Sequence, residues 1–127
     1  RNSVGYPHLP VKICATHAGI SVGEDGATHQ ALEDVAIMRA LPNMTVISPC
    51  DAVETRAAIK AAIDNYGPFY VRLGRLAVEE INDADTYKFE LGKGVTLKEG
   101  KDVAIIASGI MVDEALKAQE QLAAYMG

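Results

Sequence analysis

Residues 16–30 hold the side chains of this sequence that are best suited to acid–base or metal chemistry. The segment combines three glycines with two adjacent acids and two histidines, namely Gly19, Gly23, Gly26, Glu24, Asp25, His17 and His29. Glycine permits positive φ angles and a close approach of the backbone to a ligand, so this composition predicts a loop. We call this segment the glycine-rich loop.

Three kinds of chemistry can be compared for the glycine-rich loop. Zinc is disfavoured because His17 and His29 are far apart in the sequence and no compact His or Cys pair accompanies them. Gly-x-x-x-Gly at 19–23 is not the Rossmann fingerprint, and no Gly-Lys-Ser/Thr follows it, so neither standard nucleotide-phosphate cradle is supported. Proton transfer fits better, with Asp25 orienting a hydroxyl or a histidine. Residues that only cap and brace a turn remain the alternative at this point.

The elements that flank the glycine-rich loop place it at a ligand-binding edge. The short apolar run 11–15 predicts a buried strand, and Thr28 can cap a helix that runs to about Ala40. His29 would then lie at the first helical position, where the helix dipole favours a neutral imidazole. In open α/β sheets, ligands bind outside the carboxyl ends of the strands, which is where this loop begins.

The pattern continues as alternating strands and helices. Further strands are predicted at 45–48 and 69–73, and Asp51 and Glu54 have the spacing of a capping box for the helix between them. The apolar side of that helix is predicted to be Val53, Ala57, Ile59 and Ile63. This order predicts an α/β fold, a parallel sheet with helices on both faces.

The organisation changes after residue 75. Residues 76–91 are rich in acids and Asn and are interpreted as a linker, with a β-arm from Phe89 to Leu97. Val103 to Ala107 predicts a buried strand, and Ser108-Gly109 opens a helix, so 92–127 is the first βα unit of a second α/β domain. One such unit cannot cover both faces of its sheet, and we expect much of that domain to lie outside these residues.

Composition narrows the function classes. Apolar residues make up 49% of the chain and the net charge is −5, with scattered basic residues, which argues against nucleic acid or an anionic membrane as the main partner. The longest apolar runs are far too short to span a bilayer. Cys14 and Cys50 follow strand-like segments and are interpreted as buried thiols of a reducing, cytoplasmic compartment.

Several motifs stand in a specific order along the chain. Thr16-His17 precedes Gly23-Glu24-Asp25-Gly26-x-Thr28-His29-Gln30, and then come Leu41-Pro42-Asn43-Met44, Pro49-Cys50-Asp51, Gly67-Pro68 and Arg75. In this order and spacing they resemble transketolase from Arg1 to about Leu76, with a weaker match from Gly92 to Gly109. The amino-acid sequence at 17–20 and 33–39 more closely resembles the split, two-gene bacterial and archaeal form, whose carboxy-terminal subunit is a separate polypeptide.

The resemblance implies a partial pyrimidine-type thiamine-diphosphate-binding fold. Residues 1–75 would be the second half of the pyrimidine-binding domain, 76–91 a linker and 92–127 the start of the carboxy-terminal domain. The family moves a two-carbon ketol unit between sugar phosphates, as in the pentose phosphate pathway. By position, His29, His17 and Asp25 match its catalytic residues, with His29 near the thiazolium ring, and Arg75, His17 and Asp25 contact the sugar phosphate.

The resemblance also implies what other chains or domains must supply. Thiamine diphosphate and its Mg²⁺ or Ca²⁺ would be held mainly by residues outside this chain, and none of the present residues is assigned to the metal. The expected partner is the amino-terminal subunit or half, in a homodimer or heterotetramer. By itself the chain is expected to be inactive and to bind the cofactor weakly. The alternatives are a deoxyxylulose phosphate synthase, a 2-oxo acid dehydrogenase β-subunit, or a non-catalytic dimerisation module.

Overall fold

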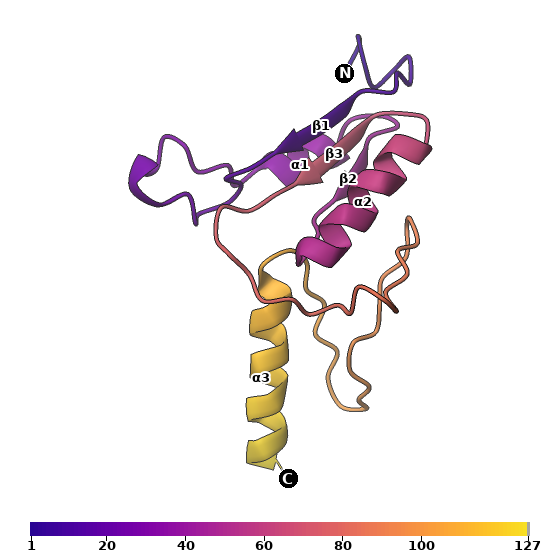
Figure 1. The fold of residues 1–127 in the computed structure, drawn as a ribbon. Coiled ribbons are helices and arrows are strands. Elements are labelled where there is room, and N and C mark those ends of the chain that lie inside the picture. The colour runs from indigo at the N-terminus through magenta and orange to yellow at the C-terminus, as the bar shows by residue number, and fades with distance from the viewer. Residues whose placement is uncertain (127) are drawn as a thin grey trace.

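The fold is built on a small parallel sheet. The computed structural model describes residues 1–126, and Figure 1 shows its ribbon. In chain order the elements are β1 (Lys12–Ala15), the 3₁₀ helix η1 (Gly23–Asp25), α1 (Asp34–Arg39), β2 (Thr45–Ile47), α2 (Ala52–Asp64), β3 (Phe69–Arg72) and α3 (Met111–Met126). β1 and β2 both pair in parallel with β3, which gives the strand order β1-β3-β2. The predicted parallel α/β sheet is therefore confirmed.

Helices lie against both faces of this sheet. Successive side chains of a strand point to opposite faces, so consecutive residues of β3 contact different helices. On one face, Phe69 of β3 belongs to a buried cluster with Ala58 and Ala62 of α2. On the other face, the hydroxyl of Tyr70 donates to the carboxylate of Asp34 at the start of α1. The prediction of helices on both faces is confirmed by this alternation.

α2 packs on the sheet through small residues. Ala58 and Ala62 are one turn apart and almost fully buried, and β2 adds Ile47 to the same cluster. Ile59 is partly buried against this cluster, as predicted. Ile63 is 72% exposed, so its predicted inward position is wrong. Neighbouring residues of an α-helix are rotated by about 100°, so a helix that turns Ala62 to the sheet turns Ile63 away from it.

The amino end of α2 is fixed by Asp51, which is only 2% exposed. Its Oδ1 accepts from the Glu54 amide at 2.8 Å, which confirms the N-cap half of the predicted capping box. The Glu54 carboxylate accepts from the amide of Cys50 at 2.8 Å rather than from that of Asp51, so the return bond is displaced by one residue. Oδ2 of Asp51 accepts from the amides of Ile81 and Asn82 at 2.9 and 2.7 Å. The middle of the expected linker is therefore bound to the end of α2.

The predicted helix from Thr28 to Ala40 is wrong in its first turns, since α1 begins only at Asp34. The Thr28 hydroxyl donates instead to the carbonyl of Asp25, at 3.5 Å, and the amide of Gly19 donates to the carbonyl of Ala31 at 3.0 Å. The chain before α1 is thus held across the loop rather than along a helix. His29 does not lie at a helix start, and the dipole argument does not apply to it.

The β-arm at Phe89–Leu97 and the strand at Val103–Ala107 are not formed. A strand needs a neighbour for its N–H and C=O groups, and within residues 1–126 no other strand lies beside either segment. Ile106 is accordingly 97% exposed. The helix that follows is formed as α3, joined to the end of β2 by a 3.1 Å bond from the Gly109 amide to the Ser48 carbonyl, and it extends away from the sheet (Figure 1).

The two cysteines differ in their surroundings. Cys50 is buried, and burial followed by the neighbouring Glu54 raises its pKa to about 12, so it remains a protonated thiol at neutral pH. Cys14 is exposed, and the prediction that it is buried is wrong because β1 is an edge strand of this sheet.

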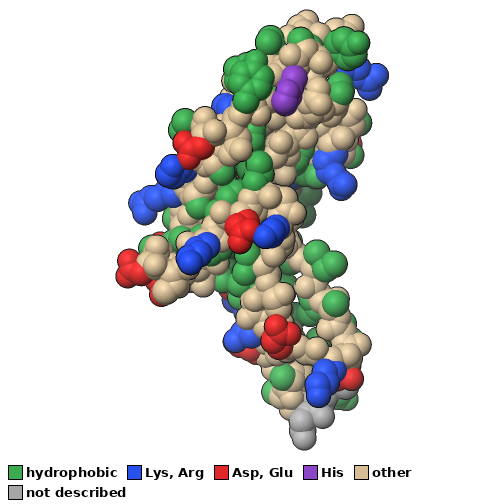
Figure 2. Space-filling model, turned by 90° about the vertical axis from the view of Figure 1, so that its right-hand side faces the viewer, with side chains coloured by type: hydrophobic (Ala, Val, Ile, Leu, Met, Phe, Trp, Pro, Cys, Tyr) green, Lys and Arg blue, Asp and Glu red, His purple; other side chains and the backbone are tan. Residues whose placement is uncertain are grey.

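The surface and the helices add two observations about possible partners. Among the described residues, no helix is long and apolar enough to cross a membrane. On the face drawn in Figure 2, the Lys and Arg side chains are interspersed with Asp and Glu rather than gathered into one patch. That face therefore lacks the concentrated positive charge typical of a nucleic-acid-binding surface.

We predict that Asp51→Asn lowers the free energy of unfolding at neutral pH by about 1–3 kcal/mol, because an amide has one acceptor oxygen where the carboxylate has two. Burial alone would raise the pKa of Asp51, but hydrogen bonds from the backbone of Glu54, Asn82 and Ile81 hold it below its ordinary value of 3.8. A lowered folded pKa stabilises the protein at neutral pH and ceases to do so as the pH falls below about 4. Urea unfolding at about pH 7 and about pH 3 measures both effects.

The difference in the free energy of unfolding between the unmodified protein and Asp51→Asn should therefore be smaller in acid than at neutral pH. Asp64→Asn is the matched control, because this carboxylate of α2 is exposed and pairs only with the exposed Lys60, so its loss should change the stability little. Equal stability of Asp51→Asn and the parent at neutral pH would contradict the role of Asp51.

Candidate functional site

The glycine-rich loop leaves the carboxyl end of β1 and is attached to the carboxyl end of β3. The amide of Ala18 donates to the carbonyl of Leu73, just beyond β3, at 3.2 Å. Ala18 and Val22 are both buried, and Val22 is only 2% exposed. The backbone of this loop therefore follows a fixed course at the sheet edge where ligands of open α/β folds bind, as the sequence predicts.

Both histidines of the loop are exposed, and each has its Nδ1 against the preceding threonine. His17 Nδ1 lies 2.9 Å from the hydroxyl of Thr16, and His29 Nδ1 lies 2.9 Å from the hydroxyl of Thr28. A hydroxyl can donate or accept here, so either tautomer is accommodated. In both cases Nε2 remains directed away from the threonine and can exchange a proton with a ligand.

Asp25 closes the short helix η1 between the two histidines. Gly26 follows at a φ of 68°, and its amide donates back to the carbonyl of Gly23 at 3.2 Å. The amide of His29 then donates to the carbonyl of Gly26 at 3.0 Å, which continues the turn. The backbone brings Asp25 and His29 into one turn, but no side-chain hydrogen bond in the described chain joins Asp25, His17 and His29 to one another.

The structure brings Arg75 onto the glycine-rich loop. A Cβ built on Gly23 would lie 2.9 Å from Nη1 of Arg75, so the guanidinium lies directly against this residue. The φ of 79° at Gly23 favours glycine there. No ion pair of Arg75 with a carboxylate is found within residues 1–126. Its guanidinium, five N–H donors in a fixed fork, is therefore available to an anion beside the loop.

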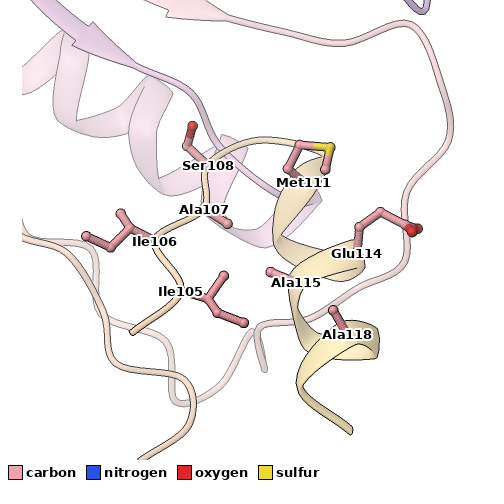
Figure 3. A pocket seen from close by; sticks show the side chains of 8 residues that line it. All are labelled: Ile105, Ile106, Ala107, Ser108, Met111, Glu114, Ala115 and Ala118. Carbon is pink, nitrogen blue, oxygen red and sulfur yellow. The ribbon is translucent and has the colours of Figure 1, made fainter. Parts of the chain in front are cut away.

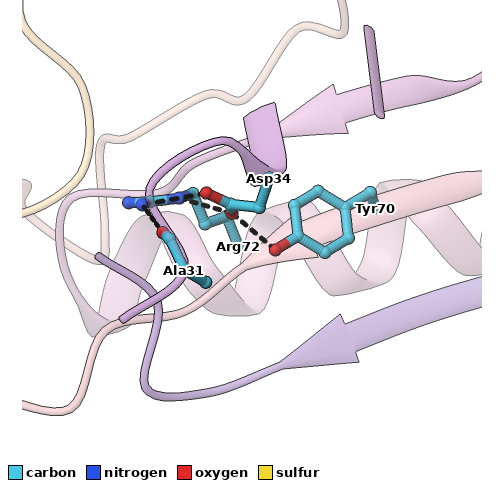
Figure 4. Close-up of polar contacts among 4 residues, drawn as sticks. All are labelled: Ala31, Asp34, Tyr70 and Arg72. Atoms are coloured by element: carbon cyan, nitrogen blue, oxygen red, sulfur yellow. Dashed lines mark hydrogen bonds and ion pairs between the residues drawn. The ribbon is translucent and has the colours of Figure 1, made fainter. Parts of the chain in front are cut away.

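Arg72, which ends β3, lies against the other end of the loop but is already paired. Its Nε donates to Oδ2 of Asp34 at 2.8 Å, and its Nη2 donates to Oδ1 of Asp34 at 3.2 Å and to the carbonyl of Ala31 at 3.4 Å (Figure 4). The hydroxyl of Tyr70 donates to the same carboxylate at 2.6 Å. Of the two arginines, Arg75 is thus the one open to a ligand.

The shifted pKa values of Asp34 and Tyr70 reflect the pairing of Asp34 with Arg72. Burial by itself would raise the pKa of Asp34, but hydrogen bonds from Arg72 and Tyr70 and the charge of Arg72 together lower it. Burial and the adjacent Asp34 carboxylate raise the pKa of Tyr70 to about 12. At neutral pH the three side chains therefore form an ionised pair with a neutral phenol.

The residues of this polar cluster were not found from the sequence. Tyr70 and Arg72 are two apart on a strand, so a shared face could be inferred. Their partner Asp34 lies on another element, and no local pattern relates it to them.

Two surface hollows lie away from the glycine-rich loop. The first, of about 490 Å³, lies between residues 105–108 and the first turns of α3 (Figure 3). The second, of about 420 Å³, is lined by Val35, Arg39, Met44, Val46, Ser48 and Ser108. Neither contains a residue of the loop. The side chains of His17, Asp25 and His29 are exposed on the surface of the described chain.

Comparisons with known proteins agree with this geometry. The family model of the transketolase pyrimidine binding domain matches residues 1–80, and that of the transketolase C-terminal domain matches residues 92–127. A Methanocaldococcus jannaschii protein provisionally named a transketolase C-terminal section is 54% identical over 123 residues, which are 96% of this chain and 39% of that protein. A 1-deoxy-D-xylulose-5-phosphate synthase of Oleidesulfovibrio alaskensis is 41% identical over 115 residues, 90% of this chain and 18% of the synthase.

A solved structure described as a split-gene transketolase, an inactive beta4 tetramer, has the same fold. It matches with a TM-score of 0.89 and 54% identity, over 98% of this chain and 40% of that one. The chain thus spans about two fifths of the length of this structure's chain and of the Methanocaldococcus jannaschii protein, and less than a fifth of the synthase. The two family models, the identity and the shared fold establish that this chain belongs to the transketolase family.

Proposed function

We propose that this chain forms the sugar-phosphate-binding wall of a thiamine-diphosphate-dependent transketolase of the split type, which transfers a two-carbon ketol unit between sugar phosphates. The observation that carries the proposal is the position of Arg75. Its guanidinium lies against Gly23, which is two residues before Asp25 in the segment bounded by His17 and His29. The candidate proton-transfer residues and the candidate anion-binding residue thus lie on segments that follow the carboxyl ends of β1 and β3.

Each group has a distinct task in this proposal. Cleavage of a ketol requires a base that takes a hydroxyl proton from the donor and an acid that returns a proton, and His29 is assigned this exchange. Asp25 accepts a hydrogen bond from the hydroxyl next to the carbonyl. Arg75 and His17 bind the phosphate end of the sugar, where a bidentate guanidinium gives both charge and orientation.

The cofactor is proposed from family membership. When bound, thiamine diphosphate supplies the electron sink for the ketol carbanion. Among residues 1–126, no three His, Cys, Asp or Glu side chains are grouped so that they could hold a metal ion. This agrees with the proposal that the Mg²⁺ or Ca²⁺, and the diphosphate with it, are held mainly by residues outside this chain.

The proposed partner is the subunit that would hold the cofactor. An amino-terminal subunit would supply the cofactor site, in a homodimer or heterotetramer. The related split-gene tetramer, described as inactive, supports the proposal that this half of the enzyme needs a partner. The domain boundaries after residues 75 and 91 and the cytoplasmic location stay predictions.

A deoxyxylulose phosphate synthase is the second candidate function, favoured by the 41% identity to such an enzyme. The adjacent Glu24 and Asp25 favour transketolase over the synthase on the resemblance of the loop. Assays of the assembled enzyme distinguish the two, because the synthase decarboxylates pyruvate, whereas transketolase moves a ketol unit between two sugar phosphates.

We predict that His29→Ala, in the full-length chain assembled with its partner subunit, lowers kcat on the order of 100-fold or more, the scale of a lost general acid–base group. Steady-state kinetics of ketol transfer measure the effect. His8→Ala is the matched control, because His8 lies away from the loop, with its ring edge-on to Tyr66 at 5.5 Å between ring centres. Turnover that survives His29→Ala intact would leave the dimerisation module as the better description.

We predict that Arg75→Ala raises KM for a phosphorylated ketose by about 10- to 100-fold, the loss expected for a hydrogen-bonded charge pair. KM for the same ketose without its phosphate should change little, because that substrate has no phosphate for Arg75 to bind in the unmodified enzyme either. Arg56→Ala, on the exposed side of α2, is the control for removal of a positive charge. An equal loss for both ketoses would contradict a phosphate-binding role for Arg75.

A further inference from the structure

The neck of the glycine-rich loop is held by side chains that take no part in the proposed chemistry. Gly19 and Ala31 close the neck through a 3.0 Å bond from the Gly19 amide to the Ala31 carbonyl. Arg72 donates to the same carbonyl at 3.4 Å, so one oxygen joins the start of the loop, its end and strand β3. A Cβ on Gly19 would lie 3.3 Å from Nη2 of Arg72, which places the guanidinium directly against the neck.

We propose that Asp34, Tyr70 and Arg72, here called the clamp, are positioning residues that fix the neck of the glycine-rich loop and thereby the location of His29. The proposal rests on the proposed function for its kinetic consequence, and on the contacts in Figure 4 for its structural one.

The clamp is suited to this task by its geometry. The planar guanidinium of Arg72 spans both oxygens of the Asp34 carboxylate and still has an N–H for the Ala31 carbonyl. Such two-point pairing restricts orientation as well as distance. Both side chains are largely buried, at 24% and 11% exposed, so water competes weakly for their hydrogen bonds. Tyr70 donates to Asp34 from the same face of β3 and restricts the carboxylate further.

The clamp also separates two roles of the positive charges near the loop. Arg72 is neutralised by Asp34, so it holds protein to protein, whereas Arg75 remains open to an anion. His29 lies inside the segment from 19 to 31 that the clamp closes. A displacement of about 1 Å in a catalytic group can lower a rate about 100-fold, so a loosened neck should act mainly on kcat.

Arg72→Lys and Arg72→Ala in the full-length chain, assembled with its partner subunit, test the proposal. Lysine keeps the charge beside Asp34 but cannot reach both carboxylate oxygens and the Ala31 carbonyl together. We expect kcat to fall about 10-fold for Lys and about 100-fold for Ala, with KM for the phosphorylated sugar changed less than 3-fold. Lys60→Ala, which removes an exposed ion pair of α2, should change neither constant and is the matched control.

Hydrogen exchange provides the readout that does not depend on activity. The Arg72 variants should exchange the amides of residues 18–30 at least about 10-fold faster, while those of α2 keep their protection. Tyr70→Phe, which removes a single donor to Asp34, should give a smaller change in the same residues and keeps the test open if Arg72→Ala does not fold. If the parent transfers no ketol unit, the proposed function fails while the exchange data still test the clamp. Unchanged exchange of residues 18–30 in Arg72→Lys, or an unchanged kcat in an active enzyme, would overturn the proposal.

Discussion

β3 pairs in parallel with both β1 and β2, and this pairing determines where the core and the glycine-rich loop lie. Phe69 is in register with Lys12 of β1 and with Thr45 of β2, so the carboxyl ends of all three strands lie at one edge. Alternation along β3 then sends Phe69 into the core under α2 and Tyr70 toward α1. The hydrophobic core and the polar support of the loop are therefore opposite faces of the same strand.

The loop at this edge combines an ordered backbone with exposed side chains. Val22 is buried, and the neck is closed between Gly19 and Ala31, so the course of the chain is fixed while His17 and His29 face solvent. Arg72 and Arg75 beside the loop are not equivalent. Arg72 is neutralised by Asp34, whereas Arg75 has no carboxylate partner within residues 1–126. This division explains how a loop rich in glycine can present chemical groups at defined positions.

Much of the fold could be predicted from short-range patterns, and the exceptions have physical causes. Predictions that depend on neighbouring residues were confirmed for the three strands of the sheet, for the cap of Asp51 on the Glu54 amide and for the position of the loop. The helix start at Thr28 was wrong because a cross-loop bridge outweighs a weak local cap there. The buried strand at 103–107 requires neighbouring strands that the described chain does not place beside it. The pairing of Arg72 with Asp34 joins residues far apart in sequence, and no local pattern encodes it.

We propose that this chain supplies one wall of a site whose cofactor is held by other residues. Calorimetric titration of thiamine diphosphate, with Mg²⁺ present, is a direct test of this proposal. We expect no measurable binding to the 127-residue chain, and saturable binding in the assembly of the whole subunit with its amino-terminal partner. Micromolar binding of the cofactor to the isolated chain would contradict it.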